Sequence, residues 1–110
     1  MDISYANSKL EKLCNSEKKL RGEYGPRMAG LILQRLADLD AADDLEVTRL
    51  LPGRCHELTQ NLKGCLAVDL VHPDRLAFRP NHNPIPKKKD GGLDWKKVTA
   101  IEVMGIGDYH

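Results

Sequence analysis

The chain has 110 residues, of which 41% are hydrophobic and 30% charged, and its formal net charge is only +1. This composition predicts one folded domain around a single hydrophobic core and excludes a disordered chain. No apolar run reaches the ~20 residues of a membrane span, and the start lacks the basic and apolar regions of a secretion signal, so we expect a cytoplasmic protein without membrane contact.

The N-terminal half predicts one strand followed by two helices. Residues 1–5 alternate between apolar and polar side chains, as a half-buried strand does. Residues 8–11 fit a capping box at the start of a helix, which residues 15–16 interrupt. Gly25 and Pro26 begin a second helix, because proline is tolerated in the first helical turn. Its core-facing side is predicted to hold Ala29, Ile32, Leu33, Leu36 and Leu39.

The C-terminal half changes to a period of two, which is typical of strands. A short strand is predicted over residues 55–58 and a turn over 60–64. Residues 65–70 and 75–79 then form a hairpin through His72-Pro73-Asp74. Leu66, Val68, Leu70, Leu76 and Phe78 should face the core, and Cys65, Ala67, Asp69, Arg75, Ala77 and Arg79 the other way. Two neighbouring strands therefore place polar groups on one shared face.

The last predicted strand runs from Val98 to Gly107. Its β-branched residues occur on both faces, which indicates a strand paired on both sides within the sheet. Asp108, Tyr109 and His110 follow at once, and these side chains can exchange protons or form hydrogen bonds. They form either a site at the end of a rigid strand or a frayed terminus.

Residues 80–97 break all periodicity with prolines, glycine pairs and the lysine run Lys87, Lys88 and Lys89, so we expect a basic, mobile loop whose far end Trp95 anchors. Seven bases and no more than three acids fall at or beside residues 75–97, whereas residues 36–46 carry five acids and no base. Such a basic region is typical of a protein that binds a polyanion, although scattered surface charge is the alternative.

Together these elements predict an α+β domain over residues 1–110, with the basic loop as an insertion at about 80–97. An N-terminal strand and two helices pack on a mostly antiparallel sheet of about four to five strands.

Several polar residues can converge on one face of such a sheet, namely His56, Lys63, Arg75, Arg79, Asp108, Tyr109 and His110. This set suits RNA cleavage, in which one group removes the 2′-hydroxyl proton, another protonates the leaving oxygen, and cations stabilise the phosphorane. That chemistry needs no metal or other cofactor. The three cysteines lack a C-x-x-C spacing, which argues against a zinc site. No G-x-S-x-G is present, and Cys55 and His56 would lie on opposite faces of a strand, so a nucleophilic triad is disfavoured.

The motifs at residues 54–58, 62–64, 74–78 and 108–110 resemble the HigB branch of the RelE/ParE toxin superfamily. The most specific piece is the final Asp-Tyr-His after a strand, with Arg-hydrophobic-x-Phe upstream. The resemblance implies a toxin of a type II toxin–antitoxin system that cleaves mRNA, usually in the ribosomal A site, without a metal. It also implies a neighbouring helix-turn-helix antitoxin, HigA-like, through which alone the toxin contacts operator DNA.

The same resemblance implies roles for individual residues. His56 corresponds to the active-site histidine of the family, Arg75 to its phosphate-binding arginine, and residues 108–110 to its C-terminal cluster. Lys63 is implied as a further phosphate contact. The sequence adds Arg79, Lys87, Lys88 and Lys89 as predicted RNA contacts, but the loop at 80–97 departs from shorter members of the family.

Three functions remain open on the sequence alone. The first is an mRNA-cleaving toxin, favoured by the proton-transfer groups at residues 108–110. The second is a ParE-like toxin that inhibits DNA gyrase, for which His110 would be dispensable. The third is an interaction module without enzymatic activity, which would leave RNA intact.

Overall fold

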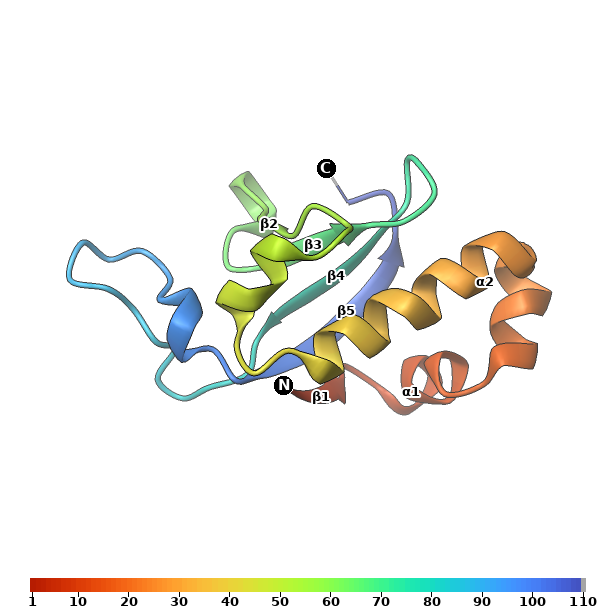
Figure 1. The fold of residues 1–110 in the computed structure, drawn as a ribbon, viewed down its shortest axis with the longest axis horizontal. Helices are drawn as coiled ribbons and strands as arrows, with labels where there is room; N and C mark the ends of the chain where they lie inside the picture. The colour runs from red at the N-terminus through yellow and green to blue at the C-terminus, as the bar shows by residue number, and fades with distance from the viewer. Residues whose placement is uncertain (110) are drawn as a thin grey trace.

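In the computed structural model, which describes residues 1–109, helices cover one face of a five-stranded sheet (Figure 1). The strand order is β1-β5-β4-β3-β2, in which β1 runs parallel to β5 and all other pairs are antiparallel. The elements in chain order are β1 Asp2–Tyr5, α1 Ser8–Cys14, α2 Glu17–Ala41, η1 Leu45–Leu50, β2 His56–Glu57, η2 Gln60–Leu62, β3 Leu66–Asp69, β4 Arg75–Pro80, η3 Trp95–Lys97 and β5 Ala100–Gly107. The predicted α+β class is confirmed. Within residues 1–109, no helix has both the length and the apolar character that crossing a membrane requires.

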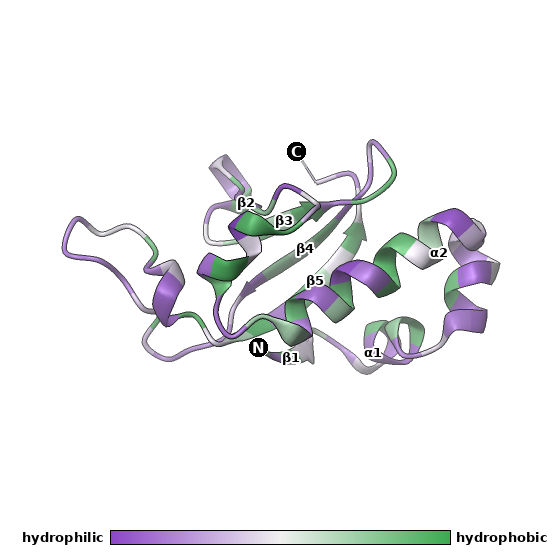
Figure 2. Ribbon diagram, viewed as in Figure 1, coloured by the Kyte–Doolittle hydropathy of each residue, from purple (hydrophilic) through white to green (hydrophobic). Residues whose placement is uncertain are grey.

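The strand β5 lies between β1 and β4, as its β-branched residues predict. Ile101 and Val103 are fully buried and point to the same side as Phe78 on β4. One side of α2 packs against this layer through the predicted apolar residues, of which Leu33 alone is only half-buried. Figure 2 shows this apolar side of α2 turned towards the sheet and hydrophilic residues on its other side.

The helix boundaries follow local capping chemistry, and one prediction is wrong. The side chain of Asn7, not of Ser8, caps α1 by accepting a hydrogen bond from the Leu10 amide at 2.8 Å. Ser16 caps α2 in the same way, which agrees with the predicted interruption. Gly25 has a φ of 82° inside α2 and breaks the helix, because glycine alone adopts this conformation without a steric cost.

Two segments contain more regular structure than the sequence indicated. The acidic stretch continues into η1, whose first turn is capped by the Asp44 carboxylate. The basic loop folds back on itself, since the Lys88 amide donates to the Gly92 carbonyl at 2.7 Å and the backbones of Lys87 and Leu93 form an isolated antiparallel β-bridge. Trp95 is buried at the far end of this loop, as predicted.

Phe78 lies at the centre of the core, so its truncation tests the packing of the sheet against α2. We expect Phe78→Ala to lower the free energy of unfolding by about 3 to 5 kcal/mol, because the ring is fully buried and its loss leaves a cavity. The matched control is Leu50→Ala, whose side chain is 87% exposed and should change stability by less than about 0.5 kcal/mol. Urea denaturation measures both, and equal effects would contradict the packing described.

Candidate functional site

The face of the sheet opposite the helices carries most of the predicted site. Cross-strand pairing puts His56, Ala67, Ala77 and Gly105 in one row across four strands, from β2 to β5. Asp69, Arg75 and Gly107 form the next row. Because neighbours across strands share a face, the polar side chains of both rows lie on this face, which we term the outer face.

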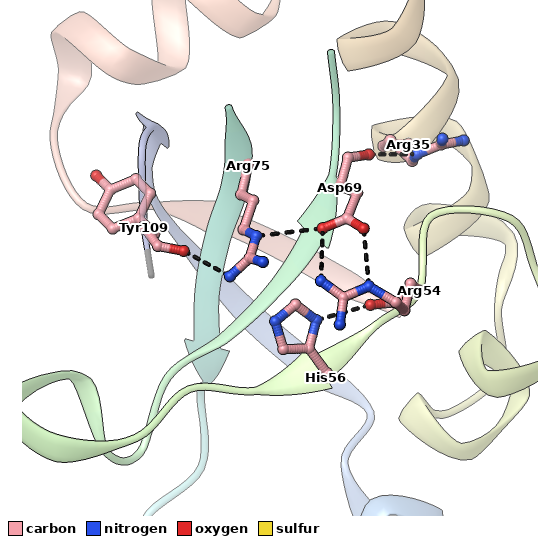
Figure 3. Close-up of polar contacts among 6 residues, drawn as sticks. All are labelled: Arg35, Arg54, His56, Asp69, Arg75 and Tyr109. Atoms are coloured by element: carbon pink, nitrogen blue, oxygen red, sulfur yellow. Dashed lines mark hydrogen bonds and ion pairs between the residues drawn. The ribbon is translucent and has the colours of Figure 1, made fainter. Parts of the chain in front are cut away.

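A carboxylate between two guanidinium groups forms the centre of the outer face (Figure 3). Asp69 accepts hydrogen bonds from Arg54 Nε at 2.9 Å and Arg54 Nη2 at 3.3 Å. Arg75 Nε lies 3.2 Å from the carboxylate oxygen Oδ1. The Arg75 side chain is only 14% exposed, whereas Arg54 is well exposed. The two cations are thus fixed side by side, one at the sheet and one at its rim.

The backbone of Asp69 is held as firmly as its side chain. Arg35 of α2 donates from Nε to the Asp69 carbonyl at 3.0 Å, and the Asp69 amide donates to the Gly53 carbonyl at 2.7 Å. Gly53 has a φ of 108°, and a Cβ there would lie 2.7 Å from Arg35 Nε. Glycine is therefore required for the turn that presents Arg54 to the carboxylate.

The charges around Asp69 keep its carboxylate ionised. Partial burial raises its pKa, but the hydrogen bond from Arg54 and the positive charges of Arg54 and Arg75 lower it by more, so the pKa lies below the ordinary value. At neutral pH the cluster therefore holds one negative charge between two guanidinium groups.

Tyr109 can lie next to Arg75 because the two residues of β5 that face it, Gly105 and Gly107, have no side chains. Arg75 Nη1 donates to the Tyr109 carbonyl at 2.7 Å. The Tyr109 hydroxyl would clash with a Cβ on Gly105, whereas the ring is within ordinary contact of such an atom on Gly107. A β-bulge between Ala77 and Phe78 brings Gly105 onto the outer face.

His56 is oriented by the backbone of the residue two positions earlier. Its Nδ1 lies 2.8 Å from the Arg54 carbonyl, which can only accept a hydrogen bond (Figure 3). A neutral His56 that donates from Nδ1 has its lone pair on Nε2. The ring nitrogen Nε2 can then remove a proton from a bound hydroxyl group.

The structure brings together part of the predicted site. His56, Arg75 and Tyr109 share the outer face, and the exposed Asp108 adjoins Tyr109, whereas His110 lies outside the described residues. Arg79 lies on the same face about 13 Å along β4 from Arg75 and pairs with Glu102 at 2.6 Å.

The predicted lysine contacts lie elsewhere. Lys63 and Lys87 line a groove with Glu57, whose neighbour His56 points to the opposite face of β2. Lys88 pairs with Asp90, and Lys89 is exposed on the same loop.

Sequence reasoning missed Arg54 and Asp69 as members of the site. The predicted hairpin contained a usable signal, because alternation already placed Asp69 and Arg75 on the same face of its two strands, and the observed register sets them directly opposite each other. Arg54 gave no comparable signal, since its position depends on the backbone turn at Gly53.

A pocket of about 110 Å³ opens beside this cluster and can accept a group the size of a phosphate. Its lining comprises Arg54, Asp69, Leu70, His72, Pro73, Asp74 and Arg75. Guanidinium groups bind phosphate oxygens through paired N–H donors, so the pocket combines suitable size and charge. Among residues 1–109, no group of three or more His, Cys, Asp or Glu side chains is placed to hold a metal ion.

No family model and no curated sequence matches the chain. Among solved structures it is similar to the YoeB/ParE toxin from Agrobacterium tumefaciens, with 12% identity, a TM-score of 0.59 and full coverage of both chains. It is also similar to the YoeB-YefM complex from Staphylococcus aureus, with 17% identity, a TM-score of 0.58, and coverage of 100% of this chain and 97% of the other. The chain has the fold of these toxins.

Replacing Asp69 by Asn tests the electrostatics of the cluster. We expect Asp69→Asn to lower the unfolding free energy at pH 7 by about 1 to 3 kcal/mol, because two guanidinium groups lose their charged partner. The native pKa of Asp69 is depressed, so this stabilisation is present above the unfolded value of about 3.9 and is lost as the pH falls through the lower native value.

Denaturation of wild type and variant between pH 7 and pH 2.5 gives the difference directly. The control Glu17→Gln removes a carboxylate from an exposed pair with Arg21 and should change stability by less than about 0.5 kcal/mol. A difference for Asp69→Asn that stays constant down to pH 2.5 would contradict the charge assignment.

Proposed function

We propose that this chain is the toxin of a type II toxin–antitoxin system, of the HigB type, and that it cleaves mRNA on the ribosome without a metal ion and thereby inhibits growth. The observation that supports this most is the cluster of Arg54, Asp69 and Arg75 beside His56 and Tyr109. The fold shared with YoeB toxin structures is consistent with the proposal.

The chemistry that fits this cluster is transfer of the phosphoryl group to the adjacent 2′-oxygen. His56 Nε2 would take the 2′-hydroxyl proton while that oxygen attacks phosphorus, and the bond from phosphorus to the 5′-oxygen would break. A proton donated by Asp108, Tyr109 or His110 would complete the leaving 5′-hydroxyl. The products are a 2′,3′-cyclic phosphate and a 5′-hydroxyl end.

The cations would act on the charge that develops during this step. Arg75 is nearly buried and held by both Asp69 and the Tyr109 carbonyl, so it meets a phosphate oxygen without reorganising. Arg54 is more exposed and suits a contact with the phosphate of a neighbouring nucleotide. Asp69 would position both guanidinium groups and would not itself contact the RNA backbone, because like charges repel.

The proposed protein partner is a cognate antitoxin. One of the similar solved structures is described as a YoeB-YefM complex. We propose that this chain is likewise neutralised by a partner, a HigA-like helix-turn-helix protein encoded beside it. Operator DNA would be contacted by the antitoxin alone.

Induction of the chain in growing cells tests the function. We expect growth arrest, mRNA cut within translated codons, and rescue by co-expression of the neighbouring antitoxin. Arg75→Ala should lower cleavage by about 10² to 10³, because one preorganised donor to the developing charge is lost. Arg21→Ala removes an exposed arginine on the helical side and serves as the matched control.

Sequencing of mRNA ends after induction provides the readout. Arrest with intact transcripts and gyrase-dependent DNA breaks would instead establish a ParE-like toxin. Growth without arrest and intact transcripts would leave an interaction module.

The position of the Tyr109 ring can be tested without removing it. A methyl group on Gly105 would clash with the Tyr109 hydroxyl, so Gly105→Ala should displace the ring and lower cleavage by about tenfold or more. Gly107→Ala is the matched control, since its new methyl would lie 3.7 Å from the ring in ordinary contact. In vitro cleavage by both variants measures the effect, and equal activities would refute a role for the ring position.

A further inference from the structure

A groove of about 460 Å³ is lined by residues of the β2–β3 connection and of the basic loop. Its lining comprises Glu57, Lys63, Gly64, Leu66, Pro80, Ile85, Lys87, Gly91, Gly92 and Leu93, and we term it the loop groove. Leu66 points to the core side of the sheet, so the loop groove lies on the opposite face from His56. The site described above therefore does not include it.

The walls of the loop groove are apolar and accessible. Ile85 is 41% exposed, and in the described part of the chain only Leu50 is another large apolar residue as open to solvent. Leu93, another lining residue, is half-buried, and the backbone β-bridge between Lys87 and Leu93 holds this part of the loop in place. An apolar surface kept open by ordered backbone can take a flat ring.

The rims of the loop groove carry positive charge from two separate segments. Lys63 stands in the β2–β3 connection and Lys87 in the loop, and both are exposed. Among the described residues of the lining, Glu57 is the one acidic residue, and its carboxylate already accepts a hydrogen bond from Trp95 Nε1 at 3.2 Å. A carboxylate with one oxygen engaged can still accept a hydrogen bond from an amino group on a base.

We propose that the loop groove binds one nucleotide of a single-stranded RNA, with its base against Ile85 and Leu93 and a phosphate between Lys63 and Lys87. The inference rests on the proposed function, and it names a second RNA contact beyond the cleaved phosphate. Apolar walls with cations on both rims complement a planar base joined to an anion. A groove of this size holds a nucleotide, whereas an amphipathic helix needs a surface several turns long.

The edge strand connects the two sites. His56 and Glu57 are consecutive in β2, the outermost strand, so one faces the proposed cleavage site and the other the loop groove. A single-stranded RNA that passes around this edge of the sheet would meet both sites in succession. The loop groove would thereby hold the RNA in register while contributing nothing to proton transfer.

Direct binding of a labelled twelve-nucleotide single-stranded RNA to the Arg75→Ala protein tests the inference without cleavage. We expect the double variant Lys63→Ala/Lys87→Ala, made in this background, to flatten the logarithmic salt dependence of Kd by about 0.7, since the two lysines share one phosphate and each neutralised phosphate of a single strand contributes about 0.7. Ile85→Ser should weaken binding about fivefold with an unchanged salt slope, because it removes apolar contact only.

The controls use residues of the same types elsewhere on the surface. Lys9→Ala/Lys12→Ala removes two exposed lysines of α1, and Leu50→Ser replaces the other exposed apolar residue. Both should leave affinity and slope unchanged. Equal losses in the groove and control variants would overturn the inference, as would wild-type binding by the groove variants.

The failure of this inference is distinguishable from the failure of the proposed function. Cleavage of mRNA by wild type with unaltered RNA binding in the groove variants would overturn the loop groove alone. Binding through the loop groove without any cleavage would overturn the nuclease function alone. If the lysine variants lose affinity for the antitoxin but not for RNA, the loop groove is a protein-docking surface and the inference is wrong.

Discussion

The contacts of Asp69 tie together the parts of the chain on which the candidate site depends. Its side chain joins Arg54, from the turn before β2, to Arg75 at the start of β4. Its backbone joins α2, through Arg35, to the turn at Gly53. One residue thus fixes the helical layer, the edge strand and the central strands relative to each other. Charged groups held in this way carry little reorganisation cost when an anion binds.

The periodic parts of the fold were accessible from sequence. The β-branched run that became β5, the apolar side of α2 and the hairpin of β3 and β4 are set by how often apolar residues recur. The capping of α1 was assigned one residue too late, because Asn7 and Ser8 are both good caps and pattern alone does not separate them. The helix η1 was missed because its six residues show no lasting period.

The site was accessible only where it follows from strand alternation. His56 and Arg75 were both predicted as site residues, and the structure places them on one face, as strand alternation allows. Arg54 joins them because its own backbone, directly after Gly53, has a φ of 49°, a feature that side-chain patterns do not report. Lys63 lies apart from His56 and Arg75, because its position depends on the β2–β3 connection, which has no alternation.

The same strands bury one face of the sheet in the core and present the candidate site on the other face. Alternation lets β3 and β4 bury Leu66 and Phe78 under the helices while presenting Asp69 and Arg75 to the other side. On the outer face, the row next to Asp69 and Arg75 contains, besides His56, only small residues, namely Ala67, Ala77 and Gly105. A side chain on Gly105 would displace Tyr109, so the absence of one there is as necessary to the arrangement of the site as the charges beside it.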